Sequence, residues 1–426
     1  MEEFNLKHHD TNTPYSVIKQ TLRLTYDNTL TKFSEFLLAL TAGMTVANIY
    51  FAHTLLDSIA DEFLISKATI GIVITISQVF YALGLLLLVP LGDILNIRSV
   101  ILYQILLLVI ALTVVSFATN NIVFFIGIGA VGLLATVTQT LVAYAALLTR
   151  PSERGRIIGL VTSGIVIGIL LARTFAGIMN DLAGWRSVYL SSAAILLLLI
   201  SLLLKKLPTK LYEKSTLSYP QLVFSVVLLL VREKILIIRG LLAFLIFISF
   251  STFWTAFVYP LVSPPHSFSH MIVGLFGLIG VFGALGANWS GNLADKGFGQ
   301  LTTFIALLLL LSSWFFISFI DSSIFLLVIG IILFDFAIQA IHVTNQSLTL
   351  KINTAARSRL TAAYMIFYSV GSATGSIIST NIYTYYGWKG ICIFGFTISF
   401  LAIIFWLTTY KATKKLLLKV DLPKIS

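Results

Sequence analysis

The sequence predicts an all-α membrane protein of 12 transmembrane helices, arranged as two six-helix bundles that repeat in parallel. Of its 426 residues, 58% are hydrophobic and only 11% are charged, whereas about 25% of the residues in a typical soluble domain are charged. Apolar stretches of about 20 residues recur along the chain, and each is long enough to cross about 30 Å of hydrocarbon. The placement of basic residues and a repeat within the chain support the same architecture.

The apolar stretches define two sets of six spans, separated by a linker at residues 205–239. The first bundle, residues 36–204, holds spans at 36–56, 68–91, 99–118, 122–148, 157–179 and 187–204. The second bundle, residues 240–409, holds spans at 240–262, 271–289, 301–320, 324–350, 360–383 and 390–409. We interpret residues 1–35 and 410–426 as cytoplasmic tails.

The basic residues predict which loops face the cytoplasm, because Lys and Arg are retained on that side of the membrane. With the N-terminus inside, 24 of the 28 Lys and Arg residues fall in the tails or in loops after even-numbered spans. Three fall outside (Lys67, Arg186 and Lys389), and Arg173 lies within a span. This asymmetry predicts an even number of spans with both termini and the linker in the cytoplasm, in the inner membrane of a cell.

Matching residues recur at one spacing in the two bundles. Gly184-Trp185-Arg186 is matched 203 residues later by Gly387-Trp388-Lys389, and Arg154 by Arg357 at the same offset. Gly168 and Gly371 are also 203 residues apart, and Asp93 and Asp295 are 202 apart. Each match occupies the same place in its bundle, which indicates a parallel duplication of six helices.

These residues resemble the major facilitator superfamily. The segment from Gly291 to Gly297, with Asp295 and Lys296, is similar to the loop signature of that superfamily after the second helix of each half, and Asp93 with Arg98 is a degenerate copy. A closer likeness is to bacterial proton-coupled drug exporters, in Ala47-Asn48-Ile49-Tyr50 and from Arg357 to Met365. Where many antiporters of the family carry a Gly-Pro pair in span five, this chain has Ala172-Arg173.

The resemblance implies alternating access around a central cavity, with proton-coupled efflux of a drug-like or amphipathic compound. It also implies a cytoplasmic gate, in which loop charges hold one half against the other. The candidate gate residues are Asp93, Arg98, Asp295, Lys296, Arg154 and Arg357.

Span ten carries the strongest residue-level signal. Asp335, Gln339, His342 and Gln346 recur at intervals that place them on one stripe of a helix. An ionised Asp within a membrane is costly, so this stripe should face a watery cavity or a partner rather than lipid. We predict that Asp335 binds the coupling proton with help from His342; polar contacts between packed helices are the alternative explanation.

Span five adds a charge and a packing surface. Gly164, Gly168 and Ala172 form a small-residue face that lets another helix approach closely. Arg173 points away from that face and needs an acid or an anionic substrate as its partner. We predict that Arg173 pairs with Asp335 in at least one state of the transport cycle.

Further polar and aromatic residues are candidate substrate contacts, because in the family spans one, four, seven and ten line the central cavity. Packing between helices is the alternative for each of them. The candidates are Asn48, Tyr50, His53, Gln78, Tyr81, Gln139, Trp254, Gln339, Asn345 and Gln346.

Several functional classes are not supported by the sequence. The single cysteine, Cys392, allows no disulfide within the chain, and His8 and His9 have no further ligands nearby, so we expect no metal site. The sequence contains no P-loop and no nucleophile motif, so we expect neither an ATP-driven pump nor an enzyme, and no cofactor. No soluble basic module suggests nucleic-acid binding. The expected partners are a small-molecule substrate, protons and the lipid bilayer, with the protein a monomer. Transport of an anionic metabolite or siderophore, and a receptor or scaffold without transport, remain alternatives.

Overall fold

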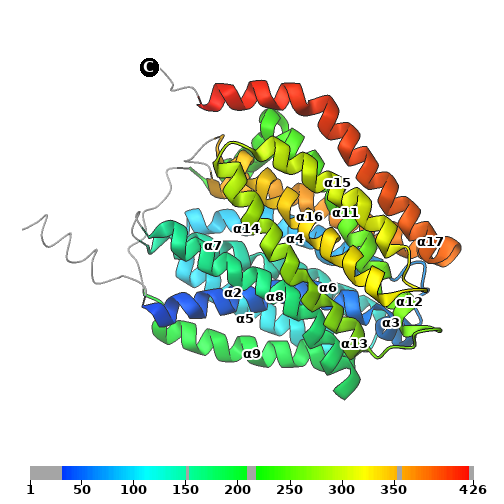
Figure 1. The fold of residues 1–426 in the computed structure, drawn as a ribbon. Coiled ribbons are helices and arrows are strands. Elements are labelled where there is room, and N and C mark those ends of the chain that lie inside the picture. Colours follow the sequence, from blue (N-terminus) through cyan, green and yellow to red (C-terminus); the bar gives the residue numbers. More distant parts are fainter. Residues whose placement is uncertain (1–30, 150–152, 209–216, 353–356, 422–426) are drawn as a thin grey trace, which may run out of the picture.

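The computed structural model describes residues 31–149, 153–208, 217–352 and 357–421, and within these ranges the chain is helical with no strands. Figure 1 shows the helices of the first half beside those of the second half. The first half contains α2 (Lys32–Tyr50), α3 (Ala52–Phe63), α4 (Ile72–Leu87), η1 (Val89–Asp93), α5 (Ile97–Ser116), α6 (Asn121–Ala135), α7 (Val137–Leu147), α8 (Arg154–Ala183) and α9 (Trp185–Lys206). The second contains α10 (Tyr219–Arg232), α11 (Lys234–Ala256), α12 (Val258–Val262), α13 (His270–Leu275), η2 (Phe276–Gly280), α14 (Val281–Asp295), α15 (Gly299–Ile317), α16 (Ile324–Leu350) and α17 (Arg357–Asp421).

The described residues include 11 helical segments that are long and apolar enough to cross a membrane. The last segment runs over 60 residues, and a straight helix of that length would measure about 90 Å, three times the thickness of the hydrocarbon. It is divided at Gly387, where the backbone leaves the helical conformation (φ 62°, ψ −161°). The segment therefore supplies two spans, which agrees with the 12 that the sequence predicts.

The same local structure recurs at the two Gly-Trp motifs. Gly184 (φ 78°) and Gly387 (φ 62°) both adopt positive φ angles that strain any residue with a side chain. The following Trp185 and Trp388 are buried. Their indole N–H groups donate to a carboxylate oxygen of Glu62 at 2.6 Å and to the carbonyl of Ile317 at 3.1 Å, respectively. The repeat seen in the sequence thus has a structural counterpart.

Three pairs of elements make most of the contact between the halves, along a surface that we call the seam: α8 packs on α13 and on η2, and α4 packs on α17. On the side away from the linker, backbone carbonyls take part in the contact: Thr174 donates to the Gly274 carbonyl at 2.9 Å and Ser376 donates to the Gly71 carbonyl at 3.0 Å. We call the face near Asp93 and Lys351 the linker face, and the face near Gly184 and Gly387 the opposite face. The seam is closed at backbone level in the half of the molecule next to the opposite face.

Within the first half, α8 lies against α2 through glycine backbone. A Cβ atom added at Gly168 would lie 2.2 Å from the carbonyl oxygen of Gly43, and one at Gly164 would lie 2.3 Å from that of Ala39. The predicted close approach of a helix to this face is confirmed. Because the neighbours are backbone atoms, no side-chain rotation can relieve the clash.

We therefore expect Gly168→Ala to lower the free energy of unfolding by about 1–3 kcal/mol, the usual effect of overpacking. Gly159→Ala is the matched control, since it lies on the same helix with no atom within 4 Å of its added Cβ. The measurement is thermal unfolding in detergent. Equal melting temperatures for the two variants would contradict this account of the α2–α8 contact.

Candidate functional site

Asp335 lies in α16 with 6% of its surface exposed, at the level where α16 meets η2. Its Oδ1 atom accepts a hydrogen bond of 3.4 Å from the indole N–H of Trp254 in α11. Its Oδ2 atom faces Gly280 of η2, where an added Cβ would approach it to 3.3 Å. The carboxylate is thus held away from lipid by elements of the second half.

Arg173 of α8, in the first half, lies over the ring of the same tryptophan, Trp254. Its side chain is 3% exposed, and its Cζ atom is 3.7 Å from the centroid of the Trp254 ring. A guanidinium over an indole face is attracted by the electrons of the ring. The Nε and Nη2 atoms have no hydrogen-bond partner, and among the described residues no ion pair within 4.0 Å joins Arg173 to Asp335.

The direct pairing of Arg173 with Asp335 is therefore absent from this conformation, and Trp254 mediates between them. One side of the indole carries the guanidinium and its N–H edge contacts the carboxylate. The two charges interact electrostatically across it. Arg173 faces the protein interior as expected, and Trp254 contacts both charged side chains.

A tyrosine contact also crosses the seam. The hydroxyl of Tyr50 in α2 is hydrogen-bonded to that of Tyr368 in α17, and Arg173 Cζ lies 5.7 Å from the Tyr50 ring centroid. We call Tyr50, Arg173, Trp254, Asp335 and Tyr368 the seam cluster. Tyr368 was missed by the sequence analysis, because a single tyrosine on an apolar helix carries no periodic signal.

The remaining stripe residues do not join Asp335 in a single cluster. His342 places Nδ1 at 3.0 Å from the hydroxyl of Tyr364, and its ring meets Phe247 edge to face at 5.2 Å between centroids. Gln339 packs against Gly283 of α14. Gln339 and Gln346 are both half-buried. His342 thus makes its hydrogen bond nearer the linker face, and its ring centroid lies 6.0 Å from that of Tyr368, a member of the seam cluster.

The candidate substrate contacts of the first half differ in whether their buried polar atoms have hydrogen-bond partners. Asn48 accepts a hydrogen bond from Ser192 at 2.8 Å, which fits a packing role. His53 stacks on Tyr50 and leaves Nε2 buried without a partner, and the amide of Gln78 is fully buried without one. Gln139 donates to the Tyr81 hydroxyl at 3.5 Å. The unsatisfied buried atoms are typical of a site that water or a ligand completes.

A second buried arginine was assigned to the linker by the sequence analysis. Arg239 lies inside α11 with 1% exposure, and its Nη1 donates to Thr303 at 3.4 Å and to Asn345 at 3.3 Å. Asn345, a candidate substrate contact, is therefore occupied by a contact within the second half. Its Nε and Nη2 atoms are buried without a hydrogen-bond partner, so these oxygens compensate the burial of the cation only in part.

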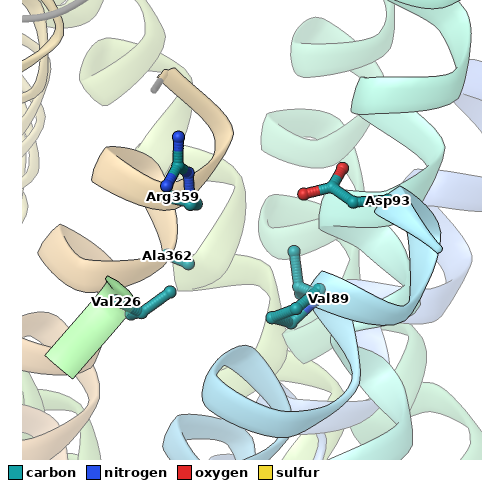
Figure 2. A pocket seen from close by; sticks show the side chains of 6 residues that line it. Val89, Asp93, Val226, Arg359 and Ala362 are labelled. Carbon is teal, nitrogen blue, oxygen red and sulfur yellow. The ribbon is translucent and has the colours of Figure 1, made fainter. Parts of the chain in front are cut away.

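Charges from the two halves also meet near the linker face. Figure 2 shows Asp93, at the end of η1, facing Arg359 of α17 across a gap. A cavity of about 10 Å³ lies between them, large enough for about one water molecule, and Val226 of the linker helix α10 lines it. Arg359 donates to Ser225 of the same helix at 3.2 Å.

The other proposed gate residues lie elsewhere or outside the described side chains. Arg98 donates to the Leu204 carbonyl at 2.7 Å within the first half, and Lys296 is exposed. The side chains of Asp295, Arg154 and Arg357 lie outside the described part, as do His8 and His9. Among the described residues, no group of three or more His, Cys, Asp and Glu side chains could hold a metal ion.

Comparisons with known proteins agree with this architecture. Residues 36–352 and 284–422 match the model of the Major Facilitator Superfamily. The uncharacterized transporter YgaY of Escherichia coli O157:H7 is 40% identical over 370 residues, which cover 87% of this chain and 94% of the relative. The inner membrane transport protein YnfM of Escherichia coli K12 is 27% identical over 268 residues, 62% of this chain and 64% of the relative.

Two solved structures share the fold. A bacterial homolog of the human lysosomal transporter Spinster, in an inward-facing and occupied conformation, superimposes with a TM-score of 0.70 at 13% identity, covering 92% of this chain and 98% of that one. The human organic anion transporter MFSD10 gives a TM-score of 0.62 at 16% identity, covering 88% of this chain and all of that one.

Proposed function

Because the chain belongs to the Major Facilitator Superfamily and is a multi-pass membrane transporter rather than an enzyme, we propose that it exports a drug-like or amphipathic compound by proton antiport. The observation that carries this proposal is the seam cluster, in which an acid of one half and a base of the other lie on one tryptophan. A group that binds protons at the seam can bias the movement of one half against the other.

The coupling follows from the charges in the cluster. When Asp335 is ionised, its carboxylate attracts Arg173 across Trp254 and favours the closed seam. When Asp335 takes up a proton, that attraction is lost while the guanidinium stays charged. A proton then shifts the conformational equilibrium by the difference in its affinity for the two conformations, which is the physical requirement for coupling.

The aromatic surroundings favour an amphipathic substrate. Phe250 and Phe253 of α11, and Phe257 directly after that helix, lie on either side of Trp254. Apolar walls with a few polar groups are the usual lining of sites for small molecules. The test is accumulation of a panel of amphipathic compounds in inverted membrane vesicles with and without a pH gradient. Accumulation only with the gradient is the expected result, and equal accumulation without it would contradict proton coupling.

A second candidate substrate class is an anionic metabolite, including a siderophore. The observation that favours it is the pair of buried Arg173 nitrogens without partners, which a carboxylate could satisfy. Carboxylate compounds in the same panel separate the two classes. A receptor or scaffold without transport is disfavoured, because it would have no need to keep these costly charges in the membrane.

We propose that the linker face is cytoplasmic and that the protein works as a monomer in the inner membrane. The excess of Lys and Arg on that side supports this orientation. Reporter fusions placed at Ser426 and within the linker should both read inside. An external reading at either position would contradict the topology.

A further inference from the structure

On the opposite face, His270 lies between two carboxylates of the other half. His270 is the first residue of α13, and its Nε2 is 2.8 Å from Oδ2 of Asp57 in α3. Its Nδ1 is 3.2 Å from Oδ1 of Asp181 in α8, and the N–H of Met271 donates to Oδ2 of Asp181 at 2.7 Å. These contacts join the start of α13 to two elements of the first half.

The geometry requires an additional proton. A neutral imidazole has one N–H donor, and an ionised carboxylate can only accept, so two simultaneous hydrogen bonds need either an imidazolium or a protonated carboxyl group. In both cases the cluster holds one proton more than a neutral histidine and two ionised acids. The side chains are 19%, 18% and 29% exposed for His270, Asp57 and Asp181, so water can reach them.

We propose that His270, Asp57 and Asp181 form a second proton-binding site, which keeps the opposite face closed while it is occupied. The site goes beyond the proton coupling assigned to Asp335, and it assumes only that the transporter alternates between conformations. When the proton leaves to water, one of the two bridges is lost and the two carboxylates face each other without a cation. Their repulsion favours separation of α13 from α3 and α8, which opens the seam on this side.

The neighbouring charges fit this assignment. The Oδ1 atom of Asp57 is buried without a partner, so Asp57 depends on His270 for its described contact. The backbone of α8 touches His270 itself, since an added Cβ at Gly177 would lie 2.2 Å from its carbonyl oxygen. The other titratable or charged groups of α3, α12 and the outer half of α8, which pack on α13, are His53, Asp61, Glu62, Arg173 and Tyr259. Glu62 is engaged by Arg186 and Trp185, and Tyr259 lies near Asp57 and Asp61.

The test measures opening without any substrate, so it can fail independently of the proposed export. Ser376 is fully buried in the closed seam and becomes a reporter as Ser376→Cys in a Cys392→Ser background, which removes the one native cysteine. Labelling by a membrane-impermeant maleimide from the opposite face is followed from about pH 5 to about pH 9, a range that brackets ordinary imidazole titration. Each rate is divided by that of the denatured protein at the same pH, which removes the titration of the thiol.

The parent protein, with only Ser376→Cys and Cys392→Ser, should be labelled about tenfold faster at about pH 9 than at about pH 5. A tenfold ratio corresponds to a difference of one pKa unit in proton affinity between the closed and the open conformation. His270→Gln should label fast at every pH, and His270→Lys, which keeps a cation between the carboxylates, should label slowly at every pH. His266→Gln is the matched control, because His266 is on the same face and its contacts, with the Ile320 carbonyl at 2.9 Å from Nε2 and with the Phe268 ring, both lie within the second half. A pH profile of His270→Gln or of His270→Lys equal to that of the parent would overturn the proposal.

Discussion

Replacing Asp335 with Asn should abolish gradient-driven transport while leaving the protein folded in the membrane. The amide keeps the shape of the carboxylate, so the side chain can still lie against Gly280 and face Trp254. It cannot bind and release a proton, and it no longer attracts Arg173. We expect gradient-driven flux to fall at least about 100-fold, to the level of vesicles without the protein, because the coupling step itself is removed.

Asp321→Asn is the matched control for this experiment. Asp321 is exposed between α15 and α16, on the opposite face and away from the seam cluster. Its variant should transport like the parent. Exchange of compound without a gradient should persist in the Asp335→Asn protein, since exchange needs no net proton movement. If gradient-driven flux were undiminished in Asp335→Asn, Asp335 would have a role in helix packing and would not bind the coupling proton.

The second large effect concerns the coupling between Arg173 and Asp335. Arg173→Gln leaves an ionised acid in a buried site without its nearest cation, so we expect loss of gradient-driven flux and a lower free energy of unfolding. Adding Asp335→Asn removes the uncompensated charge. The double variant should therefore be more stable than the sum of the single changes predicts, by about 0.5–3 kcal/mol, the range measured for residues in one network.

Arg239 provides the control for this double-mutant cycle. It is as deeply buried as Arg173, but its partners are Thr303 and Asn345 rather than the seam cluster. The pair Arg239→Gln with Asp335→Asn should show additive changes in unfolding free energy. If the changes in unfolding free energy were also additive for Arg173→Gln with Asp335→Asn, the two charges would not interact across Trp254, and this account of the seam cluster would be wrong.

The fold could be predicted from the sequence because each span is a local signal. Apolar length, the positions of Lys and Arg, and the two Gly-Trp motifs each depend on a short stretch of chain, and the positive φ angles of Gly184 and Gly387 explain why the motif recurs. The burial of Asp335 and of Arg173 could also be anticipated, since a charge within a span must turn away from lipid.

Contacts between distant segments could be predicted only in part. Trp254 was recognised as a candidate, but its position between Arg173 and Asp335 depends on how α8 and α11 approach each other. The Tyr50–Tyr368 contact joins residues 318 positions apart, and His270 lies 213 positions from Asp57. Arg239 was assigned to the end of the linker, and its burial in α11 depends on contacts with Thr303 and Asn345, which are distant in the sequence.

Proton movement during transport tests the central claim most directly. Purified protein is reconstituted in vesicles that contain a pH-sensitive dye, and a compound found in the panel is added on one side without an imposed gradient. Proton antiport predicts that movement of the compound drives protons in the opposite direction, seen as a change in internal pH that is absent from Asp335→Asn vesicles. Movement of the compound with no change in internal pH would contradict the account.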